Sequence, residues 1–226
     1  SFISRTDRIR RNRLRERVIS AGPDMMPNHI SMIMDGNRRF AWNRSMQTQA
    51  GHSAGKQKLK EVMRWVLDLK IRYLTVYALS TENLISRDKD ELDTLFDLYI
   101  SGLREISQDP LIHENKVRVQ VVGRLELLPE KVRRAINETQ EATSEYSEFL
   151  FTICLAYGGR EEIVDAVKEI AQEHASGNLN LESIDPTAIS SRLYTSELPD
   201  PDLVIRTSGE ERVSNFLLWQ IAYSEL

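Results

Sequence analysis

The chain has 226 residues and a net charge of −4, with 41% hydrophobic and 28% charged residues. This composition fits a single soluble globular domain with a full core, and no internal repeat or low-complexity tract interrupts it. One cysteine, Cys154, excludes a disulfide framework and favours a reducing, cytoplasmic location, with the thiol filling space in an apolar run.

The charge is unevenly distributed along the chain. Residues 1–20 carry seven arginines against Asp7 and Glu16, which gives this segment +5 and leaves −9 for the rest. An acidic body argues against a nucleic-acid partner, because such proteins present a basic face. We expect residues 1–26 to form a basic helical segment and residues 27–226 to form the main domain. The favoured interpretation of the basic segment is a solvated helix, and the alternative is peripheral contact with an anionic membrane surface. No apolar run reaches the roughly 18 residues of a transmembrane helix.

Strand-like and helix-like patterns alternate along the chain. In chain order they predict a strand at 30–34, a helix at 51–70, a strand at 73–79, a helix at 92–106, a strand at 117–121, a helix from Pro129, a strand at 149–155, a helix around 163–171, a short helix near 187–194 and a strand at 203–205. A last helix is expected to begin at a Ser214–Asn215 cap and to run through Trp219. This alternation predicts an α/β fold, a single domain with a mostly parallel central sheet flanked by helices on both faces.

Polar turns follow four of the predicted strands, at residues 35–40, 80–83, 157–160 and 206–214. In open α/β sheets, ligands bind beyond the carboxyl ends of the strands. One polar turn after a strand is common, but four at the same edge of a sheet indicate an active site.

Two of these turns combine acidic and basic side chains. Asp35-Gly36-Asn37-Arg38-Arg39 follows one apolar strand, and the segment from Arg206 to Arg212 follows another. A carboxylate can hold Mg²⁺, and arginines can bind the oxygens of a polyphosphate. Taken alone, Asp-Gly-Asn is usually an ordinary turn, and Arg206 and Arg212 could be surface arginines. Together the two turns suggest a site for a metal–diphosphate substrate.

Common phosphate-binding and hydrolytic motifs are missing from the sequence. There is no Gly-x-x-x-x-Gly-Lys-Ser/Thr loop, no zinc-ligand spacing and no Gly-x-Ser-x-Gly elbow. His52 lies in the run Gly51–Gly55 at the start of a predicted helix, where a phosphate could approach backbone N–H groups. The alternative is that His52 simply decorates the surface.

Taken together, these motifs resemble the cis-prenyltransferases, the undecaprenyl and dehydrodolichyl diphosphate synthases, in an archaeal- or eukaryotic-like variant. The resemblance runs from about Pro27 to Leu226. It rests on the segments His29–Arg39, Ala50–Gly55, Tyr77–Asn83, Tyr157–Arg160 and Asp202–Leu226, the last of which is the most specific. The resemblance implies that residues 27–226 are the catalytic domain of a Mg²⁺-dependent transferase. Such an enzyme condenses isopentenyl diphosphate with an allylic diphosphate and makes a Z-polyprenyl diphosphate.

The resemblance also implies a role for each matching residue. Asp35 would hold Mg²⁺ and assist departure of the allylic diphosphate, which would be surrounded by Gly36, Asn37, Arg38, Arg39 and His52. The diphosphate of isopentenyl diphosphate would be held by Arg206, Arg212 and Ser214. The catalytic set would be completed by Ser80, Glu82 and Asn83, with Asn83 as the expected proton acceptor. The substrate-binding set would be completed by Phe40, Thr48, Thr81, Arg87 and Val213.

Further expectations concern the metal, the assembly and the tunnel. Glu225 matches a second carboxylate associated with the metal, and a homodimer is expected. The apolar stripe at 92–106, with Ala78 and Phe149, could line a hydrophobic tunnel for the growing chain. It could equally be ordinary core, and the sequence leaves both interpretations open.

Several residues depart from the family pattern. Arg38-Arg39-Phe40 stands where bacterial members have Gly-Arg-Trp, Thr48 replaces an arginine, Leu84 replaces an aromatic residue, and Arg87 aligns only with one extra residue. These changes leave room for an unusual acceptor or condensation geometry. A non-catalytic partner subunit is a competing interpretation, against which the retained Asp35 and arginines argue, and a lipid-binding module is a third. Relatives continue beyond the position of Leu226, so a C-terminal tail is expected to be missing.

Overall fold

A computed structural model describes residues 13, 14, 16–18, 20, 22, 25–34, 48–207 and 209–226, and the side chains of residues 48–54 and 56 are not among those described. Most of the basic segment 1–26 therefore lies outside the described residues, and its helical character stays a prediction. Within the described part of the chain, no helix combines the length and the hydropathy needed to cross a membrane.

In this part of the chain, five parallel strands form one sheet in the order β3-β4-β2-β1-β5. The strands are β1 (His29–Ile33), β2 (Tyr73–Ser80), β3 (Val117–Val122), β4 (Phe149–Tyr157) and β5 (Leu203–Arg206). Each predicted strand is therefore present, and the predicted α/β class with a parallel sheet is confirmed.

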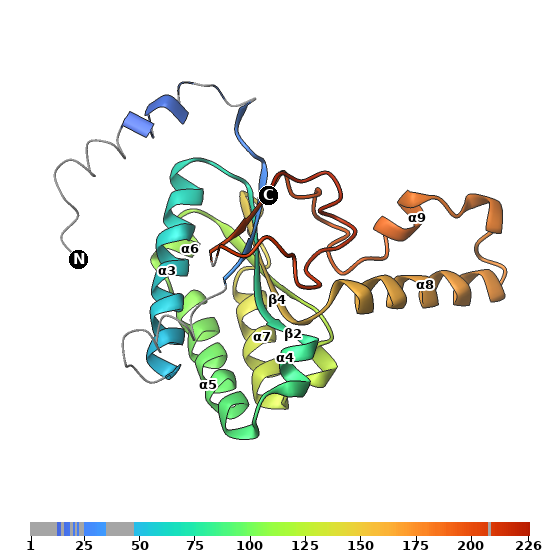
Figure 1. Ribbon diagram of the computed structural model, residues 1–226, viewed down its shortest axis with the longest axis horizontal. Coiled ribbons are helices and arrows are strands. Elements are labelled where there is room, and N and C mark those ends of the chain that lie inside the picture. The colour runs from blue at the N-terminus through green and yellow to red at the C-terminus, as the bar shows by residue number, and fades with distance from the viewer. Residues whose placement is uncertain are drawn as a thin grey trace.

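From residue 48 on, the helices are α3 (Thr48–Asp68), α4 (Thr81–Ser86), α5 (Lys89–Ile106), α6 (Pro110–Glu114), α7 (Glu130–Ala142), α8 (Gly159–Ala175) and α9 (Pro186–Ser190), with short 3₁₀ turns at Leu125–Leu127 and Leu181–Ser183. Helices α3, α5 and α7 lie along the sheet, and α8 and α9 extend away from it, as Figure 1 shows. The short helices α4 and α6 were not predicted, and α9 ends earlier than the helix expected near 187–194.

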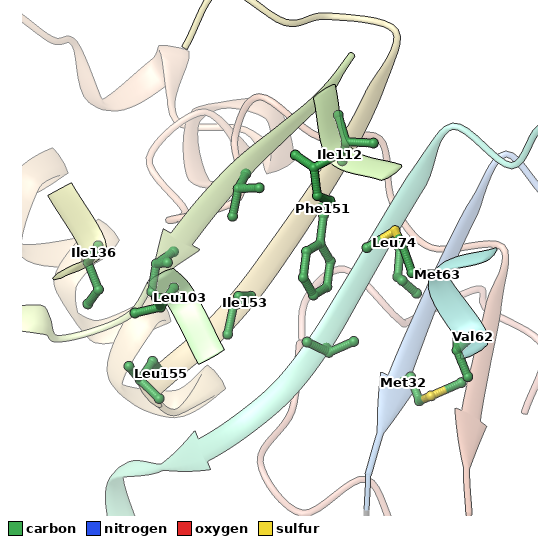
Figure 2. Packing of buried hydrophobic residues seen from close by; sticks show 14 of the residues in the cluster. Met32, Val62, Met63, Leu74, Leu103, Ile112, Ile136, Phe151, Ile153 and Leu155 are labelled. Carbon is green, nitrogen blue, oxygen red and sulfur yellow. The ribbon is translucent and has the colours of Figure 1, made fainter. Parts of the chain in front are cut away.

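The two faces of the sheet carry different cores, because successive side chains of a strand point to opposite sides. On β4, Phe151, Ile153 and Leu155 join the larger core under α3, α5 and α7, while Cys154 joins the smaller core on the other face. Figure 2 shows side chains of the larger core gathered between the strands and these helices. The predicted core position of Cys154 is confirmed, since its side chain is fully buried.

The predicted last helix from Ser214 to Trp219 is wrong. Ser214, Asn215 and Leu217 have φ angles of 49°, 63° and 46°, in the left-handed region, and the segment forms consecutive turns. A right-handed helix cannot pass through these angles. The turns insert Phe216 and Leu217, which are 0% and 1% exposed, into the smaller core. Burial of two large apolar side chains thus prevails over local helix propensity.

His29 fixes the start of β1 from inside the protein. Its ring is 1% exposed, with Nδ1 2.7 Å from the carbonyl oxygen of Pro199 and Nε2 2.8 Å from the hydroxyl of Thr75. A carbonyl only accepts, so Nδ1 carries the proton and Nε2 accepts from Thr75. Burial lowers the pKa of His29, although the Pro199 carbonyl and the charge of Asp202 oppose that shift.

We predict that acidification destabilises the fold through His29. Its folded-state pKa lies below the unfolded value of about 6.5, so the full stability is present above pH 6.5. As the pH falls below that value, the unfolded chain takes up the proton first. The free energy of unfolding should then fall by up to about 1.4 kcal/mol per pH unit. Urea unfolding between pH 7.5 and 5 measures this slope, which should become shallower in His29→Gln. In His174→Gln, which removes an exposed histidine, the slope should stay; equal slopes in all three proteins would contradict the assignment.

Candidate active site

Three of the four predicted polar turns gather at one edge of the sheet. The register pairs Ile33 with Arg206 and Ser80 with Tyr157, so β1 ends level with β5 and β2 ends level with β4. Ile33 also pairs with Tyr77, so β2 and β4 run three residues further at the same edge. The turns after β2, β4 and β5 therefore meet, as predicted. The turn from Asp35 to Phe40 lies outside the described residues, and Asp35 follows Ile33 by two positions in the sequence.

The turn after β2 is shaped by Ser80. Its hydroxyl accepts a hydrogen bond from the backbone N–H of Asn83 at 3.0 Å and caps α4. Glu82 lies in the first turn of this helix, where a negative charge is favourable. Asn83 and Glu82 are exposed at the edge of the sheet, and Thr81 is buried. The predicted catalytic residues Ser80, Glu82 and Asn83 therefore lie together in this turn, and Ser80 also has a structural role as the cap of α4.

Arg87 follows the same short helix and pairs with Glu91. Its Nη1 lies 2.6 Å from a carboxylate oxygen of Glu91, with the two side chains 15% and 22% exposed. Its Nε is buried without a hydrogen-bond partner. In this conformation the charge of Arg87 is compensated by a neighbouring acid, and its predicted contact with substrate stays a prediction.

The turn after β5 forms a compact basic cluster. Arg206 donates from Nη1 to the hydroxyl of Ser214 at 2.9 Å and to the backbone carbonyl of Arg212. Arg212 is 71% exposed and lies 3.4 Å from Glu210. Half-buried Val213 lies between Arg212 and Ser214. The structure therefore brings the predicted isopentenyl diphosphate residues together and holds the guanidinium of Arg206 in one orientation.

An apolar cavity of about 190 Å³ lies beside this edge, between the sheet, α3 and α5. Its wall is almost entirely apolar and includes Met34, Leu59, Met63, Val76, Ala78, Leu95, Leu98, Tyr99, Leu103, Ile106, Ile112 and Phe151. Met34 directly precedes Asp35 in the sequence. From the predicted stripe at 92–106, Leu95, Tyr99, Leu103 and Ile106 line the cavity, as does Ala78. The other members of the stripe and Phe149 pack in or against the core without lining it.

Gly102 leaves open space in the wall of this cavity. It lies on α5, and a Cβ added there would meet no atom within 4 Å. A glycine inside a helix costs about 1 kcal/mol relative to alanine, so Gly102 does not stabilise α5. What its missing side chain provides is space in the cavity.

Tyr77 joins the cavity to the C-terminal segment, and no role was predicted for it beyond its place in the segment Tyr77–Asn83. Its ring stacks on Phe216 with centroids 4.7 Å apart, and its hydroxyl donates to the carbonyl oxygen of Tyr157 at 3.1 Å. Burial raises the pKa of Tyr77, and the nearby charge of Glu82 adds to the shift. The hydroxyl therefore stays protonated and serves as a fixed donor.

A buried carboxylate anchors the same segment to α8. Glu162 is 0% exposed and accepts from the Tyr157 hydroxyl, from Gln220 Nε2 at 3.0 Å and from the Tyr194 N–H at 2.8 Å. Burial raises the pKa of Glu162, and these donors oppose the shift. Its position one helical turn into an amphipathic helix gave no sequence signal, because acidic residues usually lie on the solvated face.

Glu225 lies away from the polar edge in the described chain. Its backbone pairs with β5 beside Leu203, at the start of the strand, while Arg206 ends it. Three residues of strand separate these positions by roughly 10 Å. The predicted metal role of Glu225 stays a prediction, as do the roles of Thr48 and His52, which belong to α3 but have no described side chains.

The family model described as undecaprenyl diphosphate synthase matches residues 33–226, from the last residue of β1 to the end of the chain. This chain belongs to the cis-prenyltransferase family. It is therefore a prenyl-transferring enzyme that makes a polyprenyl diphosphate.

Two archaeal relatives and one solved structure are similar to this cis-prenyltransferase. The tritrans,polycis-undecaprenyl-diphosphate synthases (geranylgeranyl-diphosphate specific) of Pyrococcus horikoshii and Methanopyrus kandleri are each 51% identical to it, over 89% of this chain and 76% and 74% of theirs. Lavandulyl diphosphate synthase from Lavandula x intermedia, in complex with dimethylallyl diphosphate, has a TM-score of 0.85 and 35% identity, covering 88% of this chain and 85% of that one. The predicted archaeal-like character is confirmed.

Arg206 should bind isopentenyl diphosphate, so Arg206→Ala should mainly raise the KM for this substrate. A lost charge-assisted contact costs about 2–4 kcal/mol, or roughly 30- to 1000-fold in KM. The KM for the allylic primer should change little. Steady-state kinetics with each substrate varied in turn gives both values. Arg134→Ala removes a cation that pairs with Glu130 on α7 and is the matched control. An effect confined to the KM of the primer would show that the two subsites are reversed.

Proposed function

We propose that this cis-prenyltransferase adds isopentenyl diphosphate units to geranylgeranyl diphosphate and releases a Z-polyprenyl diphosphate. The names of the two archaeal relatives support this primer. The apolar cavity beside the polar edge carries the proposal, because a growing hydrocarbon needs an apolar space next to the diphosphate groups.

In the proposed reaction, two diphosphates bind at the polar edge in different places. Arg206, Arg212 and Ser214 hold isopentenyl diphosphate, and the described hydrogen bonds of Arg206 orient that cluster in advance. Residues 35–40, with Thr48 and His52, are expected to hold the allylic diphosphate. The allylic C–O bond breaks, the alkene of isopentenyl diphosphate forms the new C–C bond, and a proton leaves the adjacent carbon. Asn83 lies exposed in the first turn of α4 as the expected proton acceptor.

Magnesium is part of the proposal. Mg²⁺ usually takes only one or two protein carboxylates and completes its shell with water and substrate phosphates, and Asp35 offers such a ligand. Bound there, it would neutralise negative charge on the departing diphosphate. Among the described residues, no three His, Cys, Asp or Glu side chains form a cluster that could hold a metal.

A homodimer and peripheral contact with a membrane complete the proposal. Val164 and Val167, three residues apart on α8, are 48% and 49% exposed, and their contact with a second copy would support a homodimer. The arginine-rich segment 1–20 supports contact with an anionic membrane surface at the cytoplasmic side.

The competing proposal is condensation onto an unusual acceptor. It is supported by the likeness to lavandulyl diphosphate synthase and by Thr48 and Leu84, which stand where the family has an arginine and an aromatic residue. A less rigid grip on the allylic diphosphate would allow another alkene to reach the allyl cation.

We predict that the purified chain elongates geranylgeranyl diphosphate with isopentenyl diphosphate and Mg²⁺. With dimethylallyl diphosphate as the only substrate it should form no product. Mass spectrometry of the extracted lipids identifies both reactions, and added EDTA should stop the first. A branched product from dimethylallyl diphosphate alone would favour the competing proposal, and no elongation of geranylgeranyl diphosphate would contradict the proposed primer.

We further predict that a bulky residue at Gly102 shortens the product. Gly102→Phe should fill the cavity and stop elongation after fewer additions, because the next unit has no apolar space to enter. Gly102→Ala is the matched control: it should stabilise α5 by about 1 kcal/mol and keep the wild-type product length. Product lengths are read by mass spectrometry. The same lengths from Gly102→Phe and wild type would show that the chain grows elsewhere.

A further inference from the structure

The side chain of Asn215 links three turns of the polar edge. Its Nδ2 donates to Glu82 at 2.8 Å and to Glu161 at 3.0 Å, and its Oδ1 accepts from the backbone N–H of Arg160 at 2.9 Å. Ionised carboxylates only accept hydrogen bonds, so the amide has a single orientation that satisfies all of these partners. Neither of its two N–H donors is left over.

The partners of Asn215 belong to segments that are far apart in the sequence. Glu82 lies 133 residues earlier, in the first turn of α4, directly before Asn83. Glu161 lies in the first turn of α8, after β4. Asn215 itself follows Ser214, whose hydroxyl accepts from Arg206 at the end of β5. One amide therefore connects the turn that carries the expected proton acceptor with the cluster that is expected to bind isopentenyl diphosphate.

Two glycines make room for this contact. A Cβ on Gly158 would lie 2.8 Å from Asn215 Nδ2 and 2.1 Å from the Glu161 carboxylate. A Cβ on Gly159 would lie 2.9 Å from the side chain of Leu218, and the Gly159 N–H donates to the Asn215 carbonyl at 2.7 Å. Gly158 thus lies against the side chain of Asn215 and Gly159 binds its backbone, so both parts of Asn215 are held in place.

Asn215 also separates two like charges. The carboxylates of Glu82 and Glu161 both lie within 3.0 Å of one nitrogen atom. Burial alone would raise the pKa of Glu82, but hydrogen bonds from its own backbone and from Asn215 hold it below the ordinary value. Without the amide, the two acids would repel one another and the turn after β2 would shift.

We propose that Asn215 is a positioning residue that fixes the isopentenyl diphosphate-binding segment against the turn from Ser80 to Asn83. This inference rests on the proposed assignment of Arg206, Arg212 and Ser214 to that substrate. Loss of the amide displaces the nucleophilic alkene and the proton acceptor relative to one another. The allylic primer depends on residues from different segments, and its binding is unaffected.

The test begins with Asn215→Gly, which removes the amide without adding charge and suits the φ of 63°. We expect the kcat/KM for isopentenyl diphosphate to fall about 100-fold, the cost of roughly 1 Å of misplacement, with the KM of the primer within about twofold of wild type. A second variant, Asn215→Asp, keeps the shape of the side chain but replaces the donors with an acceptor. In the double variant with Glu161→Gln, the side chain at position 161 donates and the one at position 215 accepts. This double variant should recover at least about tenfold in kcat/KM relative to Asn215→Asp alone.

The outcomes separate this role from simple stability. Melting temperatures are measured for every variant, and Glu161→Gln alone shows the cost of removing that charge. An equal loss for both substrates, explained by a lower fraction of folded protein, would overturn the positioning role. So would wild-type kinetics in Asn215→Gly, or no rescue of Asn215→Asp by Glu161→Gln. A wild-type chain that forms no product with any primer would instead overturn the proposed function.

Discussion

The parallel register of β1, β2, β4 and β5 is the constraint on which the active site depends. It sets Ile33 level with Arg206 and Ser80 level with Tyr157, so residues from distant parts of the sequence reach the same edge. The side-chain period of a strand is two, so a slip by one residue would turn Met32, Val76 and Ile153 toward the smaller core. The same slip would carry Ser80 and Arg206 away from their partners. Core packing and site geometry are thus fixed by the same pairing.

The two faces of the sheet serve different purposes. One face meets α3 and α5 with apolar side chains and leaves the cavity between them. The other face holds the C-terminal segment through Phe216, Leu217 and the buried carboxylate of Glu162. This carboxylate accepts hydrogen bonds from several donors and so keeps the irregular turns in one conformation. A helix would not need it, because a helix satisfies its backbone groups internally. This arrangement lets a short segment present Ser214 and Asn215 in left-handed conformations at the polar edge.

The sequence predicted the regular parts of this fold well, for physical reasons. The apolar run at residues 149–155 is typical of a buried strand, and the apolar stripe at 92–106 has the period of a helix. In both segments the local preference agrees with the final structure. The meeting of Arg206, Arg212 and Ser214 could also be predicted, because parallel strands end at one edge. The turns at 214–219 could not, because Ser-Asn before an apolar run favours a helix locally, and only tertiary burial reverses that preference. The contact of Asn215 with Glu82 depends on side-chain positions across 133 residues, which no local pattern encodes.

Cys154 gives this architecture a built-in chemical reporter. It lies on β4, the second strand of the sheet, level with Tyr77 and Val122 on the neighbouring strands. Burial raises the pKa of its thiol, and the negative charge of Glu162 adds to that shift. Alkylating reagents react with exposed thiolates, so the folded chain should be inert to them. Because the sequence has one cysteine, each labelled molecule records a single opening of the sheet around β4. The rate of alkylation under native conditions therefore measures how often this part of the sheet opens.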